Sequence, residues 1–157
     1  MLFSTLQTEA TFLHIAASVG QPSVVLLDRG LGDPRAYLPD ALWDEILPLV
    51  GLSHAAIHGR YDLVLHLETA AKRAEQHYTR GNNAARTETV EEACKMDDRV
   101  WDAWRGHTRH ITFDNSTDFE GKLGRVIAAV EAFVAAKGGL DKAGVEAAVA
   151  AAAAQKQ

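Results

Sequence analysis

The expected fold follows from the segment Ser23-Val24-Val25-Leu26-Leu27-Asp28-Arg29-Gly30, near the start of this 157-residue chain. Its run of four apolar residues follows Gly20-Gln21-Pro22 and precedes a glycine-rich turn, a pattern that predicts a short strand buried on both faces, as in a parallel sheet. Parallel sheets bind ligands beyond the carboxyl ends of their strands. Asp28 and Arg29, at that end, are therefore candidate functional residues.

The segments after this strand alternate between helical and extended patterns. Apolar residues at intervals of three and four predict helices, at residues 2–17, 39–50, 90–104 and 117–137, with a short turn over 55–58 that Ser53 caps. Two more apolar runs predict strands, at residues 63–67 and 110–113. Alternating helices and strands favour an α/β fold with a parallel sheet between helices.

Two helix starts carry a capping box, in which a threonine hydroxyl and a glutamate three residues later satisfy backbone amides reciprocally. Thr89 and Glu92 form the first expected box, and Thr117 and Glu120 form the second. The sequence therefore predicts where the third and fourth long helices begin.

Composition limits the classes of function. The net charge of −5 and the pI near 5.8 give no basic field for a nucleic-acid partner. The only cysteine, Cys94, cannot form an internal disulfide, and no run of about 18 apolar residues suggests a membrane span. The seven histidines show no metal-ligand spacing. We expect a cytoplasmic protein with a domain over residues 1–137 and an alanine-rich tail, helical or disordered, over 138–157.

Five segments, in this order along the chain, together resemble the NadR/translocation-defect type of ATPase domain, a kinase-like group of the P-loop NTPases. They are Asp28-Arg29-Gly30, residues 33–39 (Asp-Pro-Arg-Ala-Tyr-Leu-Pro), 61–67 (Tyr-Asp-Leu-Val-Leu-His-Leu), 82–89 (Asn-Asn-Ala-Ala-Arg-Thr-Glu-Thr) and 114–120 (Asp-Asn-Ser-Thr-Asp-Phe-Glu). The likeness extends from about Leu6 to Val134.

The resemblance implies a three-layer fold, a parallel sheet flanked by helices, that binds ATP or GTP with Mg²⁺. Asp28 would match the carboxylate that ends the Walker-B-like strand and holds the nucleotide-bound magnesium. Arg29 would match a neighbouring clamp on phosphate or substrate. Without the resemblance, these two residues fit a turn with a surface ion pair equally well.

The same resemblance implies two further sets of contacts. Arg80 and Arg86, in an expected basic loop over residues 78–88, would match lid arginines, whose planar guanidinium groups bind phosphate oxygens in pairs. Asn115 and Ser116 would match the loop near the nucleotide base. The alternative for Asn115-Ser116-Thr117 is a helix cap, and for the basic loop a solvated connection.

The chain departs from the family in its phosphate-binding loop. Gly-x-x-x-x-Gly-Lys-Ser/Thr is absent, and the only Gly-Lys pair, Gly121-Lys122, falls inside an expected helix and is followed by Leu123. We therefore expect a domain that lacks the first strand and the phosphate loop, either truncated at its N-terminus or completed by another chain.

Two functions follow from this combination. The first is a nucleotide-binding ATPase or small-molecule kinase, with a nucleoside triphosphate as partner. The second is a non-catalytic interaction module that binds an anionic lipid, such as a phosphoinositide, or another protein. His66 is expected to be a hydrogen-bonded core residue, and the tryptophans are expected to be packing anchors.

Overall fold

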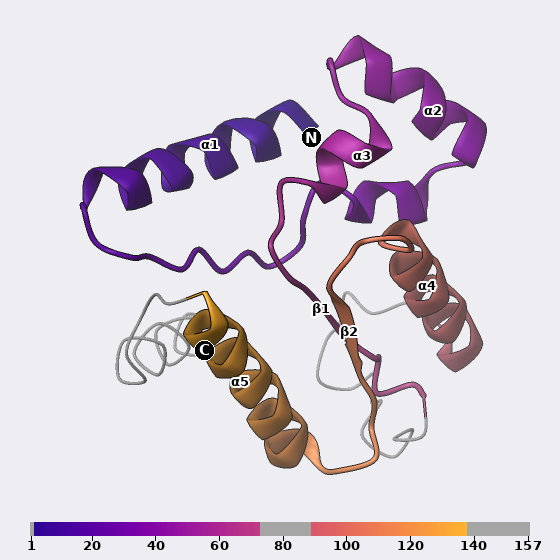
Figure 1. The fold of residues 1–157 in the computed structure, drawn as a ribbon. Coiled ribbons are helices and arrows are strands. Elements are labelled where there is room, and N and C mark those ends of the chain that lie inside the picture. The colour runs from indigo at the N-terminus through magenta and orange to yellow at the C-terminus, as the bar shows by residue number, and fades with distance from the viewer. Residues whose placement is uncertain (1, 73–88, 138–157) are drawn as a thin grey trace. The chain divides into compact units, whose positions relative to one another are not determined.

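The computed structural model describes residues 2–72 and 89–137 (Figure 1). The expected loop over 78–88, with Arg80 and Arg86, and the alanine-rich tail lie outside the described residues. The described elements, in chain order, are α1 (Leu2–Ser18), the short 3-10 helix η1 (Asp33–Tyr37), α2 (Asp40–Leu49), α3 (His54–His58), β1 (Val64–Leu67), α4 (Val90–Ala103), β2 (His110–Phe113) and α5 (Phe119–Ala136).

The chain divides into two units. One contains residues 1–30 and 123–157, and the other contains residues 31–122. The first holds α1 and most of α5, and the second holds the sheet with η1, α2, α3 and α4. The sheet and its candidate ligand edge therefore belong to the 31–122 unit.

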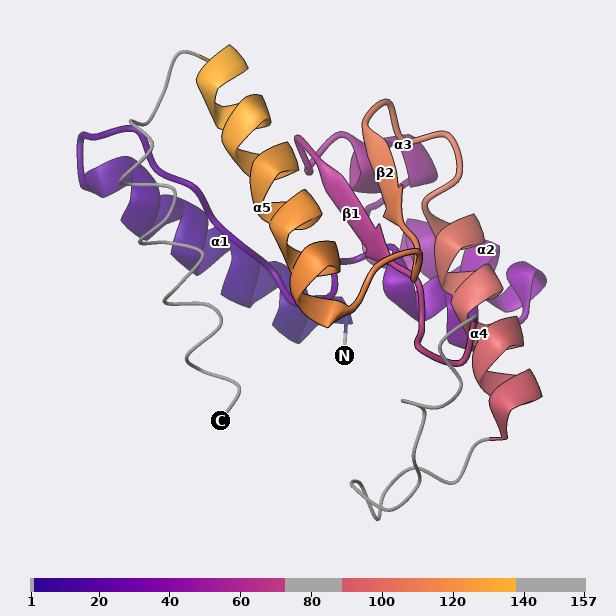
Figure 2. The ribbon, with the colours of Figure 1, turned by 90° about the horizontal axis from the view of Figure 1, so that it is seen from below.

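A two-stranded parallel sheet forms the centre of the 31–122 unit. Val64 pairs with His110 and Leu67 with Phe113, and the ladder begins with a hydrogen bond from the Val64 amide to the Arg109 carbonyl at 2.9 Å. Figures 1 and 2 show α4 beside the paired strands. Both later predicted strands and the intervening helix are confirmed, and they form the βαβ connection expected of an α/β fold.

The strand predicted at Val24–Leu27 is not formed. Residues 22–27 have no regular secondary structure, and Leu26 and Leu27 are 42% and 40% exposed. A strand exists only where a neighbouring strand satisfies its backbone groups, and within residues 2–72 and 89–137 only β1 and β2 pair. The predicted burial of this run is also wrong, because Val24 and Val25 are half-buried and Leu26 and Leu27 are exposed. Of the expected sheet, the described residues form two strands.

Side-chain caps explain where several helices begin. The Ser53 hydroxyl accepts a hydrogen bond from the Ala56 amide at 3.1 Å, as predicted, and Thr89 forms its predicted capping box with Glu92. At α5 the N-cap residue lies one position later than predicted. The Asp118 carboxylate, instead of Thr117, accepts from the third helical amide, that of Gly121, at 2.8 Å. Aspartate is an equally good N-cap, so the pattern gave the helix but not its cap.

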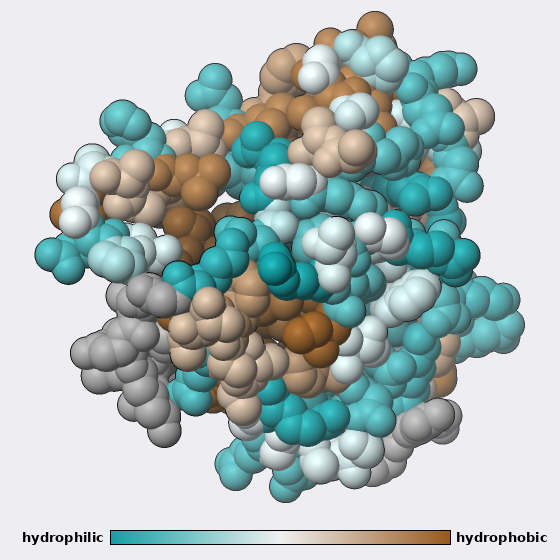
Figure 3. Space-filling model, viewed as in Figure 1, coloured by the Kyte–Doolittle hydropathy of each residue, from teal (hydrophilic) through white to brown (hydrophobic). Residues whose placement is uncertain are grey.

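Only some of the apolar side chains that predicted the helices α1 and α2 are buried. On α2 the buried residues are Trp43 and Leu47, whereas Leu42 is exposed. On α1 the exposed large apolar side chains include Phe3, Phe12, Leu13 and Ile15. Figure 3 shows brown and teal atoms side by side over this helix. The packing partner of each helix, which periodicity does not reveal, decides which apolar positions are covered.

Close packing of Gly32 against the Trp104 ring gives the first prediction. A Cβ atom at residue 32 would lie 2.9 Å from Trp104 Cζ2, so the ring would have to move within the core of the 31–122 unit. We expect Gly32→Ala to lower the free energy of unfolding by about 1–2 kcal/mol, because overpacking forces side chains away from their preferred positions. Chemical denaturation measures this loss.

Gly124→Ala is the matched control. Gly124 lies within α5, and a Cβ there would meet nothing within 4 Å. Alanine at this helical position should stabilise the chain by about 0.5–1 kcal/mol, because glycine loses more backbone entropy on folding. Equal effects of the two substitutions would contradict the packing argument.

Candidate functional site at the carboxyl edge of the sheet

The carboxyl ends of β1 and β2 meet at one edge of the sheet. Glu68 and Thr69 follow β1, and Asp114, Asn115 and Ser116 follow β2. The Glu68 amide extends the ladder by donating to the Phe113 carbonyl at 3.0 Å. Because parallel strands present their carboxyl ends together, these loops define the edge at which an α/β sheet binds its ligand.

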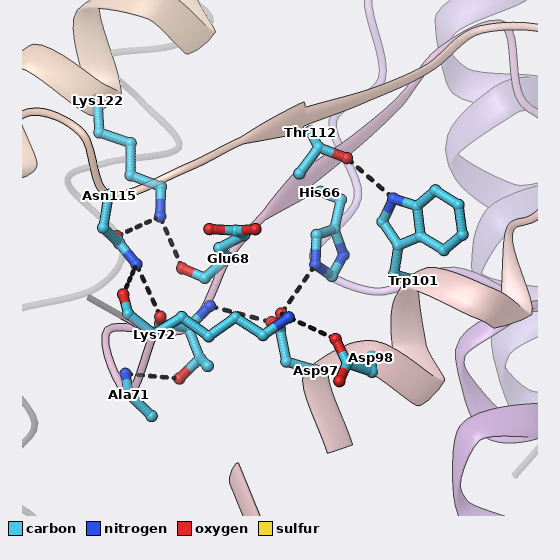
Figure 4. A network of polar contacts seen from close by, with 11 residues as sticks. His66, Glu68, Ala71, Lys72, Asp97, Asp98, Trp101, Thr112, Asn115 and Lys122 are labelled. Carbon is cyan, nitrogen blue, oxygen red and sulfur yellow. Dashed lines mark hydrogen bonds and ion pairs between the residues drawn. The ribbon is translucent and has the colours of Figure 1, made fainter. Parts of the chain in front are cut away.

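Asn115 joins the two loops (Figure 4). Its Nδ2 atom donates to the carbonyl of Thr69 at 2.8 Å and to that of Lys72 at 2.7 Å. Its Oδ1 atom accepts from Lys122 Nζ at 2.8 Å. Both amide hydrogens and one oxygen lone pair of Asn115 thus form hydrogen bonds within the protein. The side chain of Asn115 therefore fixes the loop after β2 to the loop after β1.

Lys122 places a buried positive charge behind this edge. It lies in the first turns of α5, is only 6% exposed, and donates through Nζ to the Glu68 carbonyl at 2.6 Å and to Asn115. In the sequence, Lys122 stood out only because its Gly-Lys pair does not belong to a phosphate-loop motif. Its position beside Leu123, on the apolar stripe of α5, was the signal that it would be buried and would need internal acceptors.

Asp97 holds the loop after β1 from the other side, that of α4. Its Oδ1 atom accepts from the Thr69 amide at 3.0 Å, and Oδ2 lies 2.7 Å from Lys72 Nζ and 3.3 Å from His66 Nε2. Lys72 also reaches Asp98 at 2.6 Å. The prediction that His66 is a core residue is confirmed by its burial, but its Nε2 atom contacts the Asp97 carboxylate without forming the predicted hydrogen bond.

The electrostatics of this group favour its charged forms. Burial by itself raises the pKa of Asp97, but the contacts with His66 and Lys72 and the Thr69 amide outweigh it and lower the pKa to about 2. Burial lowers the pKa of Lys72, yet hydrogen bonds to Asp97 and Asp98 leave the pKa raised above its usual range. Asp97 and Lys72 are therefore an ion pair throughout the neutral range.

Ser116 is the exposed member of the edge. Its amide and its hydroxyl both donate to Asp114 Oδ1, at 3.3 and 2.6 Å, which closes a tight turn directly after β2. The hydroxyl oxygen keeps lone pairs that can accept a hydrogen bond from a ligand. Of the two predicted base-loop residues, Asn115 thus faces the protein and Ser116 lies at the surface.

Four other residues were predicted for the site, two of them in the other unit and two outside the described residues. Asp28 and Arg29 belong to the 1–30 part of the other unit, where both are exposed and Arg29 has a φ of 78°. That φ lies in the left-handed region, which is uncommon for residues other than glycine. Arg80 and Arg86 are not among the described residues. The structure therefore brings together Asn115 and Ser116.

The described residues contain neither a candidate metal cluster nor a candidate membrane-spanning helix. Across residues 2–72 and 89–137, no group of three or more His, Cys, Asp or Glu side chains could hold a metal ion. None of the helices in this part of the chain combines the length and apolar character that crossing a bilayer requires.

A βαβ unit with two loops at its carboxyl edge defines the class as an α/β domain. The family model of the AAA domain matches residues 2–122, which include this edge and Asp28. The chain therefore belongs to this AAA domain family, of the P-loop NTPase-like class. Comparison with curated proteins and with solved structures gave no match.

Proposed function

We propose that this chain is a nucleotide-binding domain that takes ATP or GTP with Mg²⁺. The observation that carries the proposal is the AAA family match over residues 2–122, which is a match to a family of nucleotide-binding domains. The carboxyl edge supports it independently, because a polar, internally braced edge on a parallel sheet is where such folds bind ligands.

In this proposal Asn115 and Ser116 have different roles. Asn115 is a positioning residue, since its amide already bonds to Thr69, Lys72 and Lys122. Ser116, exposed in the turn closed by Asp114, is the residue that contacts the base. This division sharpens the sequence-based expectation, in which both residues shared one role.

Magnesium and phosphate contacts are assigned to charged residues. Mg²⁺ commonly binds proteins through one or two carboxylates and completes its shell with phosphate oxygens and water. Asp28 has an exposed carboxylate that fits such a role. The ion would neutralise phosphate charge. Arg29, Arg80 and Arg86 would bind the phosphates, and in ATPase or kinase chemistry they would stabilise the transferred group.

Lys122 is excluded from the phosphate-binding role. Its ammonium group is buried and donates to the Glu68 carbonyl and to Asn115, within α5 and not in a loop. The sequence contains no other Gly-Lys pair and no Gly-x-x-x-x-Gly-Lys-Ser/Thr motif. With phosphate contacts from arginines alone, this chain should bind nucleotide weakly.

The absent phosphate loop favours one second candidate, a non-catalytic module that binds an anionic lipid or a protein. Thermal unfolding of the chain with MgATP, with MgGTP and with each nucleotide plus excess EDTA separates the two candidates. A ligand that binds only the folded state raises the unfolding temperature. A magnesium-dependent rise supports nucleotide binding, whereas no rise at millimolar nucleotide favours the interaction module.

Asp28→Asn gives the second prediction. Loss of the carboxylate should weaken MgATP or MgGTP binding by about tenfold, which corresponds to about 1.4 kcal/mol, while binding of the nucleotide in EDTA stays unchanged. Titration calorimetry measures both constants. Glu45→Gln is the matched control, because Glu45 is an exposed carboxylate on α2. If the two variants bind the magnesium nucleotide equally well, Asp28 is not the metal ligand.

A further inference from the structure

Four imidazole rings gather around two tryptophans in the 31–122 unit. We define the imidazole cluster as His58, His66, His107 and His110. The His58 ring stacks on Trp104 with centroids 5.7 Å apart and meets the His107 ring edge-on at 5.9 Å. The His110 ring lies 6.0 Å from that of His66 and 5.4 Å from that of Trp101. These rings come from α3, β1, β2 and the loop before β2, so they join separate elements.

The hydrogen bonds of His107 require a neutral ring. Its Nδ1 atom accepts from the Arg109 amide at 3.1 Å, so that nitrogen carries no proton. Its Nε2 atom lies 2.8 Å from the Tyr61 carbonyl and must therefore be the protonated donor. A second proton, on Nδ1, would point toward the N–H group of the Arg109 amide, and the hydrogen bond between His107 and Arg109 would be lost.

His110 occupies a position that opposes protonation. Its Nε2 atom is buried and has no hydrogen-bond partner among the described residues. Burial lowers the pKa of His110, the charges of His66, His107 and His58 lower it further, and a backbone hydrogen bond to Trp104 acts in the opposite direction. A proton added at Nε2 would therefore be a buried charge without an acceptor.

The charged groups around His110 do not offset this cost. The Asp97 carboxylate contacts His66 and is already paired with Lys72. The Arg105 guanidinium lies over the Trp101 ring, 5.5 Å from its centroid, and pairs with Asp102 at 2.6 Å. The carboxylates of Asp97 and Asp102 are therefore already paired with Lys72 and Arg105.

The same residues hold α4 to the sheet. Trp101 donates from Nε1 to the Thr112 hydroxyl at 2.9 Å and packs against His110, and Asp97 contacts His66. We propose that the imidazole cluster is a proton-sensitive element that loosens α4 from β1 and β2 in mildly acidic solution. This role does not depend on the proposed nucleotide function.

The direction of the effect follows from linkage. In the unfolded chain His110 has the ordinary histidine pKa of 6.5, and in the folded chain its pKa is lower. Below pH 6.5 the unfolded state therefore binds more protons, so stability falls as the pH decreases and is regained above that value. Carboxyl groups have ordinary pKa values of about 4, which lie below this window.

Denaturant unfolding of the full chain at pH 7.5 and at pH 5.5 tests the third prediction. The denaturant concentration at the unfolding midpoint of the wild type should be clearly lower at pH 5.5 than at pH 7.5. His110→Asn has no imidazole at this position, so its midpoint should fall much less between the two pH values. Because each variant is compared with itself, a change in its basal stability does not affect the result. His14→Asn is the control, because His14 is exposed on α1 and the loss should equal that of the wild type. Equal losses in all three chains would overturn the proposal.

A second measurement serves if His110→Asn does not fold. An NMR titration of the wild-type imidazole signals should give His110 a pKa below the ordinary histidine value of 6.5. A His110 pKa at or above 6.5 would overturn the proposal.

Discussion

Replacing Asp97 with Asn is expected to lower the free energy of unfolding by about 3 kcal/mol, the largest effect among our predictions. Asn can still accept from the Thr69 amide, but its neutral side chain leaves Lys72 and His66 without the buried carboxylate that they contact at 2.7 and 3.3 Å. Breaking a buried ion pair by removing one partner is costly because the other group was desolvated for that contact. Denaturant unfolding at pH 7 measures the loss.

Asp98→Asn is the matched control for Asp97. Asp98 is the next residue on α4 and also binds Lys72, at 2.6 Å, but its side chain is 71% exposed. Exposed ion pairs contribute about 0–1 kcal/mol, so this variant should lose less than 1 kcal/mol. If both variants lost the same amount, burial would not explain the importance of Asp97.

Acid unfolding gives an independent check on Asp97. Its pKa is about 2 in the folded chain, against the ordinary 3.8. The carboxylate therefore contributes about 2 kcal/mol of stability above pH 3.8, and this contribution disappears as the pH falls from about 4 toward 2. Asp97→Asn should remove that part of the acid dependence and should leave the histidine window near pH 6 in place.

Replacing Lys122 with Met should cost about 2 kcal/mol, the second largest effect. Met has a similar length and fills the same buried space, but it donates no hydrogen bond. The Glu68 carbonyl and the Asn115 amide oxygen then lose donors that lie at 2.6 and 2.8 Å. Unpaired buried acceptors are the physical cause of the loss, which equilibrium unfolding measures.

Lys95→Met is the control for Lys122. Lys95 is 71% exposed and pairs with Glu91 one turn away on α4, an interaction worth about 0.3–0.5 kcal/mol. Asn115→Ala combined with Lys122→Met tests the bracing of the carboxyl edge. Because the two side chains share one hydrogen bond, the double variant should lose less than the sum of the single losses. Strict additivity would contradict a shared brace.

The candidate site was predictable only in part. Sequence patterns placed Asn115 and Ser116 at the end of a predicted strand, and both lie at the carboxyl edge. It did not indicate Asp97, because a carboxylate on a highly charged helix has the same pattern whether it is buried or solvated. The contact between α4 and the loop after β1, which joins residues far apart in the chain, makes Asp97 part of the edge.

The amino-acid sequence by itself determined the features that depend on near neighbours. The helices, the Ser53 cap, the Thr89–Glu92 box and the two paired strands all follow from local periodicity and local hydrogen bonds. Tertiary structure alone decided which strands have partners, which left residues 24–27 without a ladder. It also decided that Lys122 and Asp97 are buried ions and not surface charges. The physical reason is that burial and strand pairing depend on groups that approach only when the chain has folded.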